Sequence, residues 1–175
     1  RPGIIRRDDT VANGISVQPI QTTARTLLAE STSLQFAIPG GLIAVGTNMD
    51  PTLTRQNKLV GQTLGDKGSL PDVFCEIEVQ FFMLTELVGA KSQGKPTKPQ
   101  KLTQNEPLQI NIGTLTTGAQ VVRTRGALAQ LKLTTPVCAG AGDKLTMSRM
   151  IDRHWRLIGW GTIRRGVTAE VRFYE

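Results

Sequence analysis

The chain has 175 residues, of which 39% are apolar and 20% are charged, a composition typical of a folded globular protein. No apolar run approaches the roughly 18 residues that a membrane-spanning helix needs, and the opening RPGIIRRDD does not resemble a signal peptide. The net charge of +7 favours a polyanionic partner such as RNA, although many cytosolic domains are mildly basic. The absence of a first Met suggests a segment of a longer protein.

Turn signals are dense along the chain and separate short apolar segments. They consist of Pro-Gly, Asn-Gly and other glycine turns, at 2–3, 13–14, 39–41, 65–68, 113, 117–118 and 140–142. Short strands with turns at this spacing predict an all-β protein, either a sandwich or a barrel. TTARTLLAE (22–30) has helical propensity, but the β signals on both sides of it lead us to predict a strand and a loop.

The clearest strand is VFCEIEVQF (73–81). Its apolar residues alternate with Glu76, Glu78 and Gln80, so one face is expected to enter a core and the other to face water. The same alternation recurs in residues 108–112 and 131–133.

A domain boundary is predicted at LGDKGSLPD (64–72), where glycines and a proline precede a new strand. We therefore predict two consecutive antiparallel β-barrels, residues 1–64 and residues 72–175, joined by a linker at residues 65–71. KSQGKPTKPQK (91–101) alternates lysines with glycine, proline and polar residues, and it is expected to be an extended, solvated loop of the second barrel.

Catalytic chemistry has little support in the sequence. His154 is the only histidine, so the sequence offers no second histidine to complete a nucleophile–base pair of a catalytic site. There is no GxxxxGK[ST] loop for nucleotide phosphates, and TNMD (47–50) lacks the lysine of a guanine-reading loop. Cys75 and Cys138 lie far apart without a CxxC partner, so each is expected to be a small buried residue rather than a zinc ligand or half of a disulfide. We expect no catalytic residue, metal or cofactor in this chain.

Two glycine-bearing segments are candidate binding surfaces. AIPGGLIAVGT (37–47) joins a Pro-Gly-Gly turn to an apolar strand, and HWRLIGWGTIRRG (154–166) holds both tryptophans. Glycines in a strand let a neighbouring backbone or a ligand approach closely, although a plain tight turn also explains the first segment. Arginines flank the second segment and are candidates for phosphate contacts or for ordinary solvated charges: Arg153, Arg156, Arg164 and Arg165.

Long stretches of the chain resemble a known family. They are PGGLIAVGTNMDPTLTRQNKLVGQTLG (39–65), KLTQNEPLQINIGTLTTG (101–118) and the region from TTPVCAGAGDKLTMSRMI to RHWRLIGWGTIRRGVT (134–168). They resemble the C-terminal end of the gamma subunit of eukaryotic and archaeal translation initiation factor 2, over nearly the whole chain. PGGLIAVG followed by GQTLG also resembles the second domain of elongation-factor-Tu-like GTPases. The departures from the family pattern fall in loops, at RRDDTVANGIS (6–16) and at residues 91–101.

The resemblance implies that the two barrels are the second and third domains of a translational GTPase, whose GTP and Mg bind to an N-terminal domain not included here. It implies a cytoplasmic protein that, with GTP, delivers methionyl initiator tRNA to the small (40S) ribosomal subunit and its rRNA. The implied protein partners are the alpha and beta subunits of a heterotrimer and the nucleotide-exchange and GTPase-activating factors of initiation.

The resemblance also implies that the methionylated acceptor end lies between the first barrel and the GTPase domain. The candidate wall for it consists of Pro39, Gly40, Gly41, Gly46 and Thr47. The four arginines become candidates for contacts to RNA or between domains, and Trp155 and Trp160 are expected to pack in the core. The alternatives are a specialised elongation factor of the selenocysteine type, and a structural scaffold that joins the other subunits without touching RNA.

Overall fold

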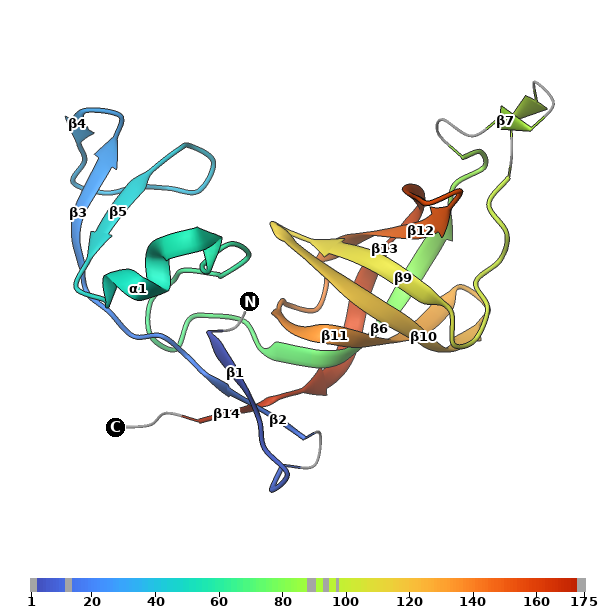
Figure 1. Ribbon diagram of the computed structural model, residues 1–175, viewed down its shortest axis with the longest axis horizontal. Coiled ribbons are helices and arrows are strands. Elements are labelled where there is room, and N and C mark those ends of the chain that lie inside the picture. Colours follow the sequence, from blue (N-terminus) through green and yellow to red (C-terminus); the bar gives the residue numbers. More distant parts are fainter. Residues whose placement is uncertain (1–2, 12–13, 88–90, 93–94, 97, 173–175) are drawn as a thin grey trace. The chain divides into compact units, whose positions relative to one another are not determined.

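The computed structural model describes residues 3–11, 14–87, 91–92, 95–96 and 98–172. The predicted all-β class is confirmed, and Figure 1 shows strands throughout the chain, with a short helical segment as the exception. The described chain forms two compact units, residues 1–19 together with 60–175, and residues 20–59. This division differs from the predicted ranges of 1–64 and 72–175, because the first strands pair with the end of the chain.

Six strands, all within the described ranges, form a closed barrel in the order β10-β11-β6-β13-β12-β9. Their bounds are β6 Val73–Met83, β9 Pro107–Ile112, β10 Leu115–Arg125, β11 Leu128–Cys138, β12 Lys144–Ile151 and β13 His154–Thr168. All neighbours are antiparallel. Two-residue turns close the hairpins: Asp152 and Arg153, between β12 and β13, both have positive φ (51° and 62°), as a type I′ turn requires.

The barrel encloses one apolar core built from alternate residues of its strands. Members that are at most 2% exposed include Ile77, Val79, Leu108, Ile110, Val121, Leu131, Leu145, Met147, Ile158 and Ile163. The alternation predicted for residues 73–81 is confirmed from Ile77 onward. Near the start of β6 the pairing with both neighbours shifts, and there Phe74 joins the barrel core while Val73 and Cys75 join a second cluster.

The second cluster lies under a three-stranded sheet of order β1-β2-β14, formed by Ile4–Arg7, Ile15–Gln18 and Glu170–Val171. Strand β14 runs parallel to β2, and Arg172 donates its backbone N–H to Val17 at 2.9 Å. Val17, Val73, Cys75 and Ala169 are buried together. The N-terminal strands are therefore part of the same compact unit as the closed barrel.

Residues 20–59 form a smaller unit with a sheet of order β4-β3-β5, formed by Thr32–Ser33, Ala24–Ala29 and Ala44–Thr47. The strand predicted within residues 22–30 is confirmed as β3. A single turn of helix, α1 (Pro51–Thr54), begins where the Asp50 carboxylate accepts the backbone N–H of Thr52 at 2.8 Å, and η1 (Arg55–Asn57) follows it. In this unit, every residue of which is described, no residue is buried.

Part of the predicted loop at 91–101 also forms strands. Strand β7 (Lys91–Ser92) pairs antiparallel with β8 (Lys95–Pro96). Residues 93–94 and 97 lie outside the described residues.

The core placement predicted for the two tryptophans is wrong, because Trp155 is 46% exposed and Trp160 is 42% exposed. A β-bulge explains the difference. Met147 pairs with Gly159 and Ser148 with Leu157, so Ile158 is an extra residue on β13. The bulge shifts the alternation of side chains along β13, and both tryptophans face the outside of the barrel.

Candidate nucleic-acid interface

The predicted aminoacyl-end wall lies in the smaller unit, in the loop before β5 and in β5 itself. Pro39 and Gly40 form a turn, and Gly40 has a φ of +127°, a backbone conformation that glycine adopts without strain. Pro39, Gly40 and Gly41 are exposed, while Gly46 and Thr47 are half-buried in β5. All five predicted residues lie on one short segment of the chain, the loop before β5 and β5 itself.

Three large apolar side chains on this segment were missed by the sequence analysis. Phe36 is 76% exposed, Ile38 is 74% exposed and Leu42 is 92% exposed. They stand on both sides of the Pro39–Gly41 turn, and we call residues 36–42 the apolar loop. The signal in the sequence was FAIPGGLI, in which apolar residues continue through a turn that would ordinarily be polar.

The glycines of this segment have different neighbours. A Cβ on Gly41 would meet Ile43 Cδ1 at 3.8 Å, an ordinary contact, so the position has room for a side chain. A Cβ on Gly46 would instead collide with the side chain of Thr26, its partner on β3. Gly46 is therefore explained by packing within its own sheet, whereas nothing in the described structure fills the space beside Gly40.

The four predicted arginines do not form one patch. Arg153 lies in the turn at the start of β13, and Arg164 and Arg165 lie near its other end. Eleven residues of extended chain from Arg153 to Arg164 span roughly 35 Å. Arg156 is half-buried and pairs in register with Arg149 on β12.

A second bulge on β13 places Arg164 and Arg165 on the same face. Ile163 pairs with Val79 and Arg165 with Glu78, which leaves Arg164 as the extra residue, and both arginines are exposed. Arg165 donates two hydrogen bonds to the Glu78 carboxylate, both at 3.0 Å. The hydrogen bond and charge of Arg165 hold the pKa of Glu78 below its usual value.

Arg123 is a further cation of this surface that the sequence analysis missed. Arg123 pairs with Gln130, Gln130 with Glu78, and Glu78 with Arg165, so the four side chains form one row across β10, β11, β6 and β13. The charges of Arg123 and Arg164 also lower the pKa of Glu78. We call Arg123, Arg164 and Arg165 the basic cluster. The sequence VVRTR (121–125) alone does not show that Arg123 belongs to this cluster. Its position follows from the register of β11 and β6, which lie between β10 and β13.

Arg149, beside Arg156, has a structural role. Its guanidinium forms a double ion pair with Glu106, in which Nη2 lies 3.1 Å from Oε2, and it donates to the backbone oxygens of Gln100 and Lys101 at 3.0 and 3.2 Å. The Arg149 and Glu106 side chains are only 15% and 11% exposed. This network attaches residues 100–106 to the barrel.

His154 is exposed at the start of β13. Among the described residues, no group of three or more His, Cys, Asp or Glu side chains is placed to hold a metal ion. Cys75 is buried and Cys138 is half-buried, and burial raises the pKa of both thiols. In the part of the chain that the structure describes, no helix is long and apolar enough to cross a membrane.

The fold is similar to that of a translation factor of known structure. The chain is similar to the structure of translation elongation factor SelB from Methanococcus maripaludis in its apo form, with a TM-score of 0.56 at 14% identity. That similarity covers 87% of this chain and 36% of the elongation factor, and at this identity it shows the fold alone.

Sequence similarity identifies the family. Residues 75–163 match the family model described as "Initiation factor eIF2 gamma, C terminal". The chain is also 48% identical, over 172 residues, to eukaryotic translation initiation factor 2 subunit gamma of Schizosaccharomyces pombe. The chain belongs to the eIF2 gamma C-terminal family. The match to the S. pombe subunit covers 98% of this chain but only 38% of that relative, so the chain spans about two fifths of its length.

Proposed function

We propose that this chain is the tRNA-binding β region of a translation initiation factor 2 gamma subunit. With a GTP- and Mg-binding domain, the subunit would bind methionyl initiator tRNA and deliver it to the small (40S) ribosomal subunit in the cytoplasm. The same proposal includes GTP hydrolysis by the whole subunit, the alpha/beta/gamma heterotrimer, and the exchange and GTPase-activating factors of initiation. Membership of the family and the high identity to a curated gamma subunit support it.

The apolar loop is the observation that carries the proposal. Phe36, Ile38 and Leu42 are exposed apolar groups that a folded protein leaves in water only at a cost, unless a partner covers them. An unbranched thioether side chain adapts to an irregular apolar surface, and the backbone at Gly40 and Gly41 allows close approach by a ribose or a base. The loop would bind the methionyl group, and the glycine turn would bind the terminal adenosine.

The basic cluster would supply contacts to phosphates. Arg165 is held by Glu78, whereas Arg164 extends from the bulge beside it and is exposed. Arginine recognises phosphate through paired N–H donors, and contacts of this kind make RNA affinity fall with salt. Arg164 is therefore the proposed contact residue, and Arg165 orients the cluster.

The proposal for the loop is tested with Gly41→Val in the whole gamma subunit loaded with GTP. The structure has room for a side chain at Gly41, so the fold should be retained. We expect the affinity for methionylated initiator tRNA to fall about tenfold, and that for uncharged tRNA about twofold or less. Filter binding of the two tRNAs measures this difference, with Leu64→Val, at an exposed leucine outside the loop, as the control.

An equal loss for the charged and uncharged tRNAs would place the methionyl group elsewhere. Gly46→Val does not serve as a test, because its side chain collides with Thr26. Normal binding of both tRNAs by Gly41→Val, with intact binding of the other subunits, would favour the scaffold alternative.

The proposal for the basic cluster is tested with Arg164→Gln. We expect weaker association with tRNA or the small ribosomal subunit, by about threefold to tenfold at 100 mM salt, and a salt dependence reduced by about one phosphate contact. Arg7→Gln removes an exposed arginine from β1 and is the matched control. Equal effects of the two variants would assign Arg164 to the ordinary solvated charges.

A further inference from the structure

The outside of the barrel carries an exposed aromatic site that the proposed function does not use. Asn111 of β9, Thr146 of β12, Trp160 of β13 and Phe82 of β6 form one row across four neighbouring strands. Trp160 and Phe82 are 42% and 45% exposed. The bulge at Ile158 places Trp160 in this row rather than in the core.

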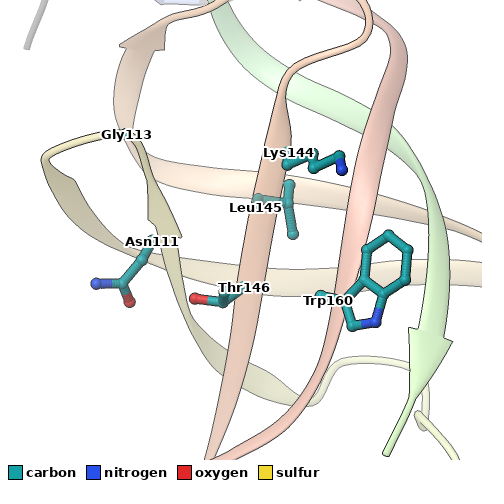
Figure 2. Close-up of a pocket in the computed structure, with 6 residues that line it drawn as sticks. All are labelled: Asn111, Gly113, Lys144, Leu145, Thr146 and Trp160. Carbon is teal, nitrogen blue, oxygen red and sulfur yellow. The ribbon is translucent and has the colours of Figure 1, made fainter.

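The indole of Trp160 is held in place by its neighbours. Its ring stacks on that of Phe82, with the centroids 4.7 Å apart and the planes at 25°. Lys144 Nζ lies 5.9 Å from the indole centroid. Lys144, Thr146, Asn111 and Trp160 are among the residues that line an open hollow of about 400 Å³. In Figure 2, Lys144 and the indole lie on one side of β12, and Thr146 and Asn111 lie on the other. This provides a fixed aromatic surface with a cation and polar groups around it.

Basic residues outnumber acidic ones on this face. Strands β9, β12 and β13, all of whose residues are described, contain no Asp or Glu, whereas β12 and β13 contain Lys144, Arg149 and Arg156 besides the Arg164 and Arg165 of the basic cluster. The fourth strand, β6, carries Glu76 and Glu78, and Glu78 is paired with Arg165. Arg149 forms an ion pair with Glu106 and so does not offer its charge to a ligand, whereas Lys144 lines the hollow beside Trp160. An acidic peptide would also be attracted by the charge, but a hollow lined by a stacking ring and by amide and hydroxyl groups fits a planar base with polar edges better.

We propose that this face binds single-stranded RNA, with one base stacked against Trp160. Phe82 supports the indole from the side of β6, and Lys144 attracts the phosphate next to the stacked base. Thr146 and Asn111 offer an hydroxyl and an amide to the base edge. The Asn111 amide donates to Thr116 Oγ1 at 2.9 Å, which fixes the orientation of the side chain. The inference depends only on the barrel and stands apart from the tRNA site proposed for the apolar loop.

The first experiment measures the binding of a labelled hexaadenylate to the intact chain by fluorescence anisotropy. Stacking of one base on an aromatic ring corresponds to a factor of about five or more in affinity, so Trp160→Leu should weaken binding by at least fivefold. Trp160→Phe keeps an aromatic face and should retain most of the affinity. Lys144→Gln should weaken binding about threefold and reduce the salt dependence, while Lys67→Gln, at an exposed lysine of the 64–72 segment, should change neither.

The second experiment locates the bound base. The chain has two tryptophans, so Trp155→Phe leaves Trp160 as the sole indole emitter. Hexaadenylate should quench its emission with the same saturation curve as the anisotropy. Thermal unfolding of each variant verifies that the barrel is retained, and Trp160→Phe covers the case in which Trp160→Leu does not fold.

The proposal is overturned if hexaadenylate does not bind, or if Trp160→Leu and Lys67→Gln bind it alike. It is also overturned if the intact chain self-associates through this face, which sedimentation would show as a dimer that Trp160→Leu dissociates. Selective binding of an acidic peptide in place of the oligonucleotide would assign the face to a protein partner and reject RNA.

Discussion

The closed barrel and the unit of residues 20–59 both contain large apolar residues, but the barrel buries many of them and the smaller unit leaves several exposed. In the barrel, apolar side chains such as Leu131 and Ile110 are completely buried. In residues 20–59 no residue is buried, and Phe36, Ile38 and Leu42 are largely in water. A three-stranded sheet with one short helical segment cannot enclose a core, whereas six strands closed on themselves can.

This contrast assigns most of the folding stability to the barrel and an exposed apolar binding surface to residues 20–59. The barrel's apolar residues are used for its own folding, and its outer surface is mostly polar, with large apolar side chains such as Trp160 and Phe82 as exceptions. The smaller unit keeps its apolar residues exposed, so a ligand or a further domain can cover them. Three experiments test this division.

The largest effect is expected from truncation of a leucine in each region. Leu131→Ala removes a side chain that is 0% exposed and leaves a cavity, so the free energy of unfolding should fall by about 2–5 kcal/mol. Leu42→Ala, at 92% exposure, should change it by about 0.5 kcal/mol or less. Urea unfolding of the two variants measures the difference. Similar losses would mean that the apolar loop packs in solution, and the comparison of the two regions would then be wrong.

An intermediate effect is expected from removing one arginine in each region. Arg149→Met leaves the Glu106 carboxylate unpaired at 11% exposure, and we expect a loss of about 2–4 kcal/mol in unfolding free energy. Arg25→Met removes an exposed hydrogen bond of 3.2 Å to Asn48 and should cost about 0.5 kcal/mol or less. The double variant Arg149→Met with Glu106→Leu should recover much of the loss. Failure of that rescue would show that the bonds to Gln100 and Lys101, rather than the charge pair, carry the effect.

The smallest effect is expected in the pH dependence of stability, for which one carboxylate in each region is compared. The pKa of Glu78 in the barrel is lowered by Arg165, and that of Asp50 in the smaller unit is lowered by the backbone N–H of Thr52. A carboxylate with a depressed pKa in the folded state stabilises that state above its unfolded pKa, near 4.5 for Glu and 3.8 for Asp, and the stabilisation is lost as the pH falls through the folded pKa.

Salt should distinguish the two causes. In about 1 M salt the charge of Arg165 is screened, so the pKa of Glu78 should move toward its usual value more than that of Asp50, whose partner is a neutral N–H. Side-chain NMR titrations at low and high salt measure both. An equal response would indicate that the hydrogen bonds, not the charge of Arg165, set both pKa values.

The two glycine-bearing segments show how far sequence patterns reach. Glycines beside Trp160 predict close packing of a neighbour, and this is confirmed, since a Cβ on Gly159 or Gly161 would collide with β6. The same segment gave a wrong position for the tryptophans. The two results have different causes: close contact between β13 and β6 requires glycine locally, whereas the outward position of Trp160 depends on a bulge in the pairing of β13 with β12.

The predicted site residues divide in the same way. The apolar loop is continuous in the sequence, so its candidate residues lie together whatever the fold. The basic cluster joins Arg123 with Arg165, and its members meet only because β10, β11, β6 and β13 are neighbours in the barrel. Arg153 and Arg164 lie far apart because they stand near opposite ends of the extended strand β13.

The sequence by itself determined the all-β class, the positions of most turns, and the inward face of β6 from Ile77 onward. These features depend on the local conformational preferences of glycine and proline and on the two-residue period of a strand. Tertiary structure decided that β14 pairs with β2, that Trp160 and Arg164 face outward, and that the barrel closes through the pairings of β13 with β6 and of β12 with β9. Those outcomes depend on register between strands distant in the sequence, and an inserted residue at a bulge reverses every side chain beyond it.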